Sequence, residues 1–166
     1  DYRVGERIDH VDGMTIEESE HMMATRLYQN TARVHFNQHA EKDGRFGRRI
    51  VYGGYVISLA RALSFNGLAN AFSVAAINGG RHVAPAFAGD TVYAWSEVLD
   101  TLSLPGRNDL GALRLRTVAT KDRRCADFPY KLADGRYDPS VLLDFDYTVW
   151  MPKRPGSGRS PTPSAA

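Results

Sequence analysis

One run of the sequence, residues 28–63, gathers most of the side chains that could do chemistry. It holds His35 and His39, and it turns directly into an apolar, helix-like pattern that opens with Gly53 and Gly54. An imidazole titrates near neutral pH and therefore suits proton transfer. The first amides of a helix have no partner within it and attract negative charge. The run is either an ordinary surface loop or the edge of an active site, since a lone loop histidine is more often solvated than catalytic.

The composition excludes several classes of protein. The chain has 166 residues, of which 43% are hydrophobic and 24% are charged, as in an ordinary globular domain. The net charge of +2 is too small for a nucleic-acid surface, and no apolar run approaches the length of a membrane span. We therefore expect neither nucleic acid nor membrane as a partner.

The chain has one cysteine, Cys125, so neither an intrachain disulfide nor a cysteine-based metal site can form. This agrees with a reducing compartment, and the charged N-terminus lacks an export signal, so a cytoplasmic location is predicted. The sequence has no initiator Met, which suggests a piece of a longer protein. Residues 154–166 are rich in Pro, Gly and Ser, which predicts a disordered tail after a domain that spans 1–153.

A helix must position Gly53 and Gly54, and the residues that follow predict one. Apolar side chains recur at helical spacing, at Val56, Leu59, Ala60 and Leu63. Small residues elsewhere on this helix suggest that it is buried against a sheet on several sides, and Gly67 is expected near its end.

The segments on either side predict the rest of the fold. Thr15 and Glu18 have capping-box spacing, which predicts a helix start there, with an apolar face that includes Ile16, Met23 and Leu27. Residues 29–47 have no sustained period and are predicted to be a long loop. Further segments at 71–85, 89–104, 111–122 and 141–154 are strand-like, three of them with strict alternation, and turn-forming residues separate them. We expect an α+β fold, with an antiparallel sheet wrapped around one long central helix.

The order of these segments resembles the MaoC-like dehydratases, which have the hot-dog fold. The strings that carry the resemblance are "FGRRIVYGGYVISLARAL" and "GDTVYAWSEVLD". Two longer strings, "HMMATRLYQNTARVHFNQHAEKDGRFGRR" and "RALSFNGLANAF", are similar to the mesaconyl-CoA hydratase (β-methylmalyl-CoA dehydratase) subfamily. That subfamily carries two hot-dog units in one chain, and the missing Met suggests that this chain is the C-terminal unit.

The resemblance assigns roles to particular residues. The family's Asp-x-Asn-Pro-x-His loop places its His on His35 and its Asp on Asn30, so here an amide stands where the family has a carboxylate. A shifted alignment makes His39 the second candidate. The family's "HG" at the helix start falls on Tyr52 and Gly53, which is followed by Gly54.

An amide cannot accept a proton, so the role of the family Asp has to be filled differently. Either His35 performs both proton transfers, or a carboxylate such as Glu41 or Asp43 substitutes, or a partner unit contributes one. The amides of Gly53 and Gly54 would hold the thioester oxygen. Arg33 or Arg81 would bind the substrate's free carboxylate, and Arg48 would contact CoA phosphates. His10, His21 and His82 are expected to be surface or packing residues.

The implied reaction is the reversible addition of water to an enoyl-CoA, with mesaconyl-C1-CoA and β-methylmalyl-CoA as the pair of substrates. The implied partner is a second hot-dog unit, as a dimer or within one chain. The resemblance implies neither a metal nor a cofactor beyond the CoA of the substrate. Two alternatives stay open, because one fold hosts many functions: an acyl-CoA thioesterase, and a non-catalytic half that binds acyl-CoA.

Overall fold

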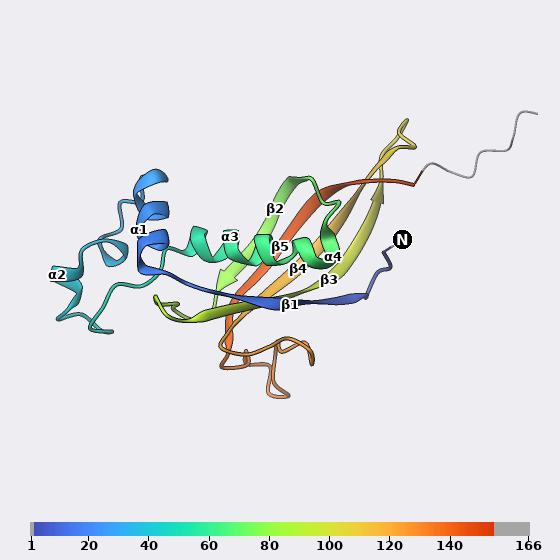
Figure 1. The fold of residues 1–166 in the computed structure, drawn as a ribbon. Coiled ribbons are helices and arrows are strands. Elements are labelled where there is room, and N and C mark those ends of the chain that lie inside the picture. The colour runs from blue at the N-terminus through green and yellow to red at the C-terminus, as the bar shows by residue number, and fades with distance from the viewer. Residues whose placement is uncertain (1, 155–166) are drawn as a thin grey trace, which may run out of the picture.

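The computed structural model, which describes residues 2–154, contains one five-stranded antiparallel sheet (Figure 1). The four segments predicted as strands form four of its strands, whereas the strand at Arg7–Thr15 was not predicted. The strand order is β1-β3-β4-β5-β2. The strands are β1 (Arg7–Thr15), β2 (Ser73–His82), β3 (Thr91–Ser103), β4 (Leu110–Lys121) and β5 (Val141–Pro152). Side chains alternate between the two faces of each strand, so one face packs on a helix and the other turns outward. The expected α+β layout is confirmed.

Helix α3 (Gly53–Leu63) lies across the inner face of the sheet (Figure 1). The four apolar side chains that predicted it are all buried: Val56, Leu59, Ala60 and Leu63. They join the core with inward-facing residues of the strands, including Val98, Leu115 and Tyr147. The expectation that α3 is covered on several sides is wrong for the described chain, because Ser58 and Ala62 are exposed on its other face.

The N-terminal region differs from the prediction. Thr15 is the last residue of β1 and contacts the Thr91 hydroxyl at 2.9 Å, so it does not cap a helix. Helix α1 (Glu18–Leu27) begins after Glu17, whose side chain makes no capping bond. The predicted apolar face is also wrong, because α1 buries His21, Met22, Ala24 and Thr25. Met23 and Leu27 are 61% and 70% exposed, since they lie on the side of the helix turned away from the core.

The predicted loop at 29–47 is largely irregular but contains two short helices, η1 (Arg33–His35) and α2 (Gln38–Glu41). With α1, these lie beyond the N-terminal end of α3 (Figure 1). At the other end of α3, the chain turns through the short helix α4 (Phe65–Leu68). Gly67 has a φ of 103° there and closes the turn, as its residue type predicted.

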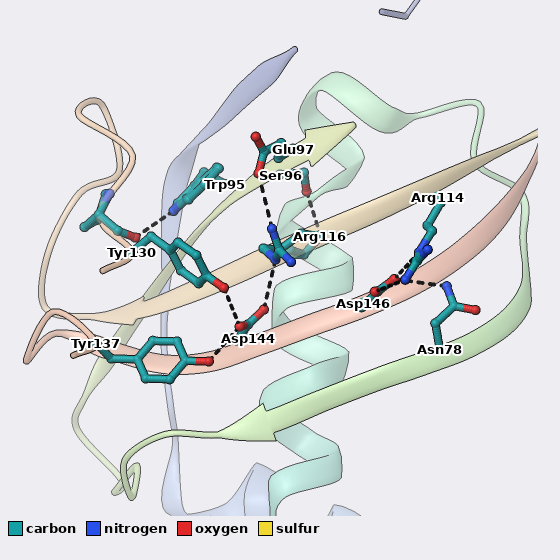
Figure 2. Close-up of polar contacts among 12 residues, drawn as sticks. Asn78, Trp95, Ser96, Glu97, Arg114, Arg116, Tyr130, Tyr137, Asp144 and Asp146 are labelled. Carbon is teal, nitrogen blue, oxygen red and sulfur yellow. Dashed lines mark hydrogen bonds and ion pairs between the residues drawn. The ribbon is translucent and has the colours of Figure 1, made fainter. Parts of the chain in front are cut away.

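The connection from β4 to β5, residues 122–140, folds back over part of the outer face of the sheet. Figure 2 shows how it is attached: Asp144 of β5 accepts hydrogen bonds from the Tyr130 and Tyr137 hydroxyls, both at 2.8 Å. The other carboxylate oxygen of Asp144 lies 3.4 Å from the guanidinium of Arg116. Beneath this connection, Trp95 donates a hydrogen bond to the Pro129 carbonyl at 2.9 Å. An outward-facing aromatic residue on β3 is therefore buried.

A chain of hydrogen bonds crosses the buried inner face near α4. His10 of β1 bonds the Asn66 carbonyl through Nδ1 at 2.6 Å and the Ser96 hydroxyl through Nε2 at 2.8 Å. Ser96 of β3 bonds Thr117 of β4 at 2.7 Å, and Thr117 bonds the Tyr147 hydroxyl of β5 at 3.0 Å. All four side chains are fully buried, and burial lowers the pKa of His10.

Among residues 2–154, none of the helices combines the length and the apolar character needed to cross a bilayer. The predicted disordered tail falls almost wholly on residues 155–166, outside the described residues.

Candidate active site

One cavity of about 390 Å³ brings together residues from three separate parts of the chain. His35 comes from η1, Gly53 from the start of α3, and His82 from the last position of β2. Apolar side chains form the remaining walls: Phe46, Ile50, Val51, Val56, Val83, Ala84, Pro85 and Ala86. The walls are joined by backbone bonds from Ile50 to Val34 at 3.2 Å and from Val51 to Ala86 at 2.8 Å. The cavity is thus mostly apolar, with few polar groups.

His35 is held in one orientation and one tautomer. Its Nδ1 lies 3.0 Å from the carbonyl oxygen of Ile50. A carbonyl can only accept a hydrogen bond, so Nδ1 carries the proton in neutral His35 and Nε2 keeps a free lone pair. The edge of the imidazole also meets the Tyr52 ring at a centroid distance of 5.9 Å. His35 therefore presents a proton acceptor that is fixed by its neighbours.

Two rings occupy the space beside Gly53 and Gly54. A Cβ atom on Gly53 would lie 2.6 Å from Nε2 of His82, and one on Gly54 would lie 2.6 Å from the Tyr52 hydroxyl oxygen. Any residue other than glycine would push these rings away. The first amides of α3 have no acceptor within the helix, so they are available to a ligand with negative charge.

His82 lies at the end of the edge strand, opposite Leu143 of β5. One side of its ring packs on Gly53, although the residue remains exposed in this chain. Partial burial, and then the charge of His35, lower the pKa of His82 below its usual value. His82 is therefore more easily kept neutral than a free imidazole.

Helix α1 carries a buried imidazole near His35. His21 of α1 is 1% exposed, and its Nε2 lies 3.4 Å from the Glu18 carboxylate. Glu18 also pairs with Arg49, which in turn donates to the Phe36 carbonyl at 3.2 Å. Burial, and then the charge of His35, lower the pKa of His21. This chain of contacts fixes α1 against the segment that carries His35.

The other predicted proton-transfer residues do not line this cavity. The Asn30 side chain accepts a hydrogen bond from the Ala32 amide at 2.8 Å and lines a separate cavity beside α1. His39 is exposed on α2. Of the two carboxylates considered as substitutes, Glu41 lies 3.7 Å from the Arg33 guanidinium and Asp43 is exposed. In the described chain, His35 and His82 are the only ionisable side chains in the cavity lining.

The three predicted substrate-binding arginines lie in different places. Arg33 lies two residues before His35, but its side chain is 70% exposed. The guanidinium of Arg48 lies 4.0 Å from the centre of the Phe87 ring, which packs edge-on against Phe46 of the cavity lining. Arg81 is opposite Asp144 in β2 and precedes His82, so it faces the outer side of the sheet. Arg48 is thus connected to the cavity lining through Phe87.

Within residues 2–154, no three His, Cys, Asp or Glu side chains are arranged as metal ligands. The absence of a cofactor stays a prediction. The buried Cys125 thiol has its pKa raised to about 11, mainly by desolvation, so it is not a ready nucleophile.

His82 was expected to be a surface or packing residue, and its place in the cavity was missed. The signal that could have found it is the strand alternation, which puts His82 on the same face as Leu143 and the core. That signal needs the pairing of β2 with β5, which sequence spacing alone does not give.

Comparisons with known proteins agree with this architecture. No protein-family model matches the chain. The chain is 75% identical over 154 residues to a β-methylmalyl-CoA dehydratase of Chloroflexus aurantiacus and 59% identical over 155 residues to a mesaconyl-CoA hydratase of Cereibacter sphaeroides. These matches cover 93% and 92% of this chain but only 44% and 43% of the two relatives.

Solved structures give the fold. A putative MaoC domain protein dehydratase from Chloroflexus aurantiacus matches with a TM-score of 0.90 and 75% identity, over 44% of its own chain. A MaoC-like dehydratase from Rhodospirillum rubrum, 17% identical, matches with a TM-score of 0.68 over 95% of its chain. A Mycobacterium tuberculosis protein described as having a double hotdogfold, 20% identical, matches with a TM-score of 0.65 over 51% of its chain.

Proposed function

Because this chain has the hot-dog fold of MaoC-like dehydratases and its close homologues are a β-methylmalyl-CoA dehydratase and a mesaconyl-CoA hydratase, we propose that it is one unit of a hydro-lyase. The proposed reaction is the reversible addition of water to an enoyl-CoA, with mesaconyl-C1-CoA giving β-methylmalyl-CoA. The chain spans less than half the length of both relatives, so the activity belongs to the protein that contains this unit. Its predicted location is the cytoplasm.

The observation that carries the proposal is the pairing of His35 with the start of α3 in one cavity. Hydration of an unsaturated thioester needs a base for the water that attacks Cβ and a site for the negative charge that develops on the thioester oxygen. His35 offers Nε2 as the base, because its Nδ1 is bonded to the Ile50 carbonyl. The amides of Gly53 and Gly54 offer the site for the negative charge.

Tyr52 supports both His35 and the start of α3, since its ring contacts His35 and lies over Gly54. It thereby limits how far His35 can turn and how widely the cavity opens at the helix start. Apolar side chains form most of the cavity walls, which reduces the water around the polar groups and strengthens the electrostatic interactions between them. The attacking water would then be the one held by His35.

The arginines are proposed as substrate-binding residues. Arg33 is exposed at the first position of η1, where its guanidinium could bind the free carboxylate that distinguishes the substrate from simple enoyl-CoAs. Arg81 is the alternative, although it lies on the outer side of the sheet in this unit. Arg48, whose guanidinium packs on Phe87, is proposed to contact the phosphates of CoA.

A second hot-dog unit is the proposed partner. Every residue of the edge strand β2 is exposed in the described chain. Large apolar side chains are exposed on and beside it, namely Phe72 at 64%, Val74 at 44% and Ile77 at 69%. An exposed, apolar edge strand is a surface that another strand normally covers. The match to half of a double hot-dog protein supports the same arrangement.

The test is to incubate the intact protein that contains this unit with mesaconyl-C1-CoA and to follow the loss of enoyl-thioester absorbance. The native protein should remove the absorbance, and His35→Gln should slow it by roughly 10²–10⁴-fold, the usual contribution of a general acid–base group. The amide keeps the size of the side chain but cannot take the proton.

Two other outcomes would replace the proposal. Release of free CoA thiol, detected with a thiol reagent, would make the protein a thioesterase. Hydration that is unchanged in His35→Gln would mean that this unit only binds acyl-CoA. The position of the Asn30 amide outside the cavity would then explain that result.

A further inference from the structure

We propose that His82 is the second catalytic residue of this site and transfers the proton at Cα of the substrate, while His35 serves the water at Cβ. The inference rests on the proposed hydro-lyase function. It deepens that function, because it fills the role that the amide of Asn30 leaves open.

The first step is elimination by geometry. The Asn30 side chain bonds the backbone of its own loop and borders a different cavity. Glu41 pairs with Arg33, and neither carboxylate considered as a substitute lines the cavity. Within the described chain, His82 is the one ionisable side chain that shares the cavity with His35. A two-group mechanism in this unit must therefore use His82.

The second step is position along the substrate. The thioester oxygen and Cα are both bonded to the same carbonyl carbon, so Cα lies close to the oxygen site. The His82 ring packs directly on Gly53, where the first free amides of α3 would hold that oxygen. His35 approaches from η1 and the Ile50 side of the cavity. Cβ lies one bond further from the oxygen, and we place it toward His35.

The third step is the chemistry, written for dehydration. A free nitrogen of neutral His82 takes the Cα proton, and the C–H electron pair moves into the thioester as an enolate. The amides at Gly53 and Gly54 hold the enolate oxygen. The electron pair then returns to form the Cα=Cβ bond, the C–O bond at Cβ breaks, and Nε2–H of protonated His35 gives its proton to the departing hydroxide, which leaves as water. Hydration is the reverse sequence.

The surroundings of His82 favour the neutral form that this step requires. His35 faces it within the cavity, and partial burial together with the charge of His35 lowers its pKa. On its own strand, Arg81 points to the other face of the sheet. On β5, Leu143 is opposite His82, and Asp144 is engaged with two tyrosine hydroxyls and Arg116. Gly53, which the ring contacts on α3, carries no charge.

The experiment uses the intact protein with β-methylmalyl-CoA in D₂O and measures deuterium entering Cα of the unreacted substrate by mass spectrometry, alongside net dehydration. Native protein should do both. His35→Gln should still exchange the Cα proton while dehydration falls by roughly 10²-fold or more. His82→Gln should lose exchange and dehydration together, with an unchanged melting curve because the glutamine side chain is close to the imidazole in size. Any residual dehydration by His82→Gln should lack the acid limb of the native kcat profile.

His82→Ala adds a second readout, since free imidazole should restore part of the lost exchange through the open side of the cavity. A purely structural role for His82 predicts no such rescue. Cα exchange that persists in His82→Gln but is absent in His35→Gln would overturn the assignment and make His35 the single base. Native protein that neither exchanges nor dehydrates would overturn the proposed function itself, and the role of His82 with it.

Discussion

Replacing Gly53 by alanine should disable the site through His82 without unfolding the protein. The added Cβ would lie 2.6 Å from Nε2 and 2.8 Å from Cε1 of the His82 ring. Nonbonded heavy atoms rest at about 3.5–4.0 Å, so the imidazole has to move by about 1 Å. A displacement of that size at a reacting group costs about 10²-fold in rate, which corresponds to about 2.7 kcal/mol in the activation free energy.

Stability should change little, because the His82 ring can turn toward solvent and alanine favours a helix over glycine by about 1 kcal/mol. The assay is kcat for loss of enoyl-thioester absorbance, with the unfolding temperature measured on the same preparations. Gly79→Ala is the matched control, since it lies three residues before His82 on β2 and an added Cβ would meet no atom within 4 Å.

A double variant separates displacement of His82 from any other effect at the helix start. In a His82→Ala background, Gly53→Ala should cost no further activity, because the ring that it displaces is already gone. The reasoning fails if Gly53→Ala keeps native kcat, if Gly79→Ala loses as much activity, or if the two changes multiply in the double variant.

Three further outcomes are expected. Lowering the pH from about 7.5 to about 5.5 should lower the unfolding temperature: burial depresses the pKa of His10 below 6.5, so below that pH the unfolded chain binds more protons than the folded chain does. An unfolding temperature that holds or rises with acid would contradict this. Asp144→Asn should reduce the free energy of unfolding by about 1–3 kcal/mol, measured in urea, because both tyrosine hydroxyls and Arg116 lose their charged partner. Asp12→Asn at an exposed site should stay within about 0.5 kcal/mol, and equal losses in the two variants would refute the role of Asp144. Arg33→Ala should reduce the preference for mesaconyl-C1-CoA over crotonyl-CoA in kcat/KM, and an unchanged ratio would remove Arg33 as the carboxylate ligand.

The sequence predicts most of the sheet and α3 because their patterns are local. Alternation along β4 and β5 and the helical spacing from Val56 to Leu63 each report burial on one face of a single element. The prediction for the N-terminal region is wrong because it also relied on a local pattern. The Thr15–Glu18 spacing fits a helix cap, but pairing of β1 with β3 takes Thr15 into the sheet. The spacing of residues within one segment carries no information about its pairing with a distant strand.

In the site, too, residues that are close in the sequence could be predicted and residues brought together by the fold could not. His35 and the glycines at the start of α3 could be proposed together because they lie in one short run with a recognisable order. His82 could not, because it reaches the cavity only through the pairing of β2 with β5, far along the chain. The sequence likewise does not predict why position 53 needs a glycine, which is that the His82 imidazole takes the space where a Cβ atom would lie.

The buried hydrogen-bond chain from His10 to Tyr147 runs in one direction only. The Asn66 carbonyl can only accept, so neutral His10 donates from Nδ1 and its Nε2 accepts from the Ser96 hydroxyl. Thr117 must then donate to Ser96, and Tyr147 must donate to Thr117. Each member comes from a different strand, and these four strands are neighbours in the sheet. If any one strand shifted by a single residue, its side chain in this hydrogen-bond chain would turn to the outer face of the sheet. The buried partner would then lack a hydrogen bond, which costs about 1–3 kcal/mol of stability. These buried hydrogen bonds therefore specify the register of β1, β3, β4 and β5, which the apolar contacts around them would not fix alone.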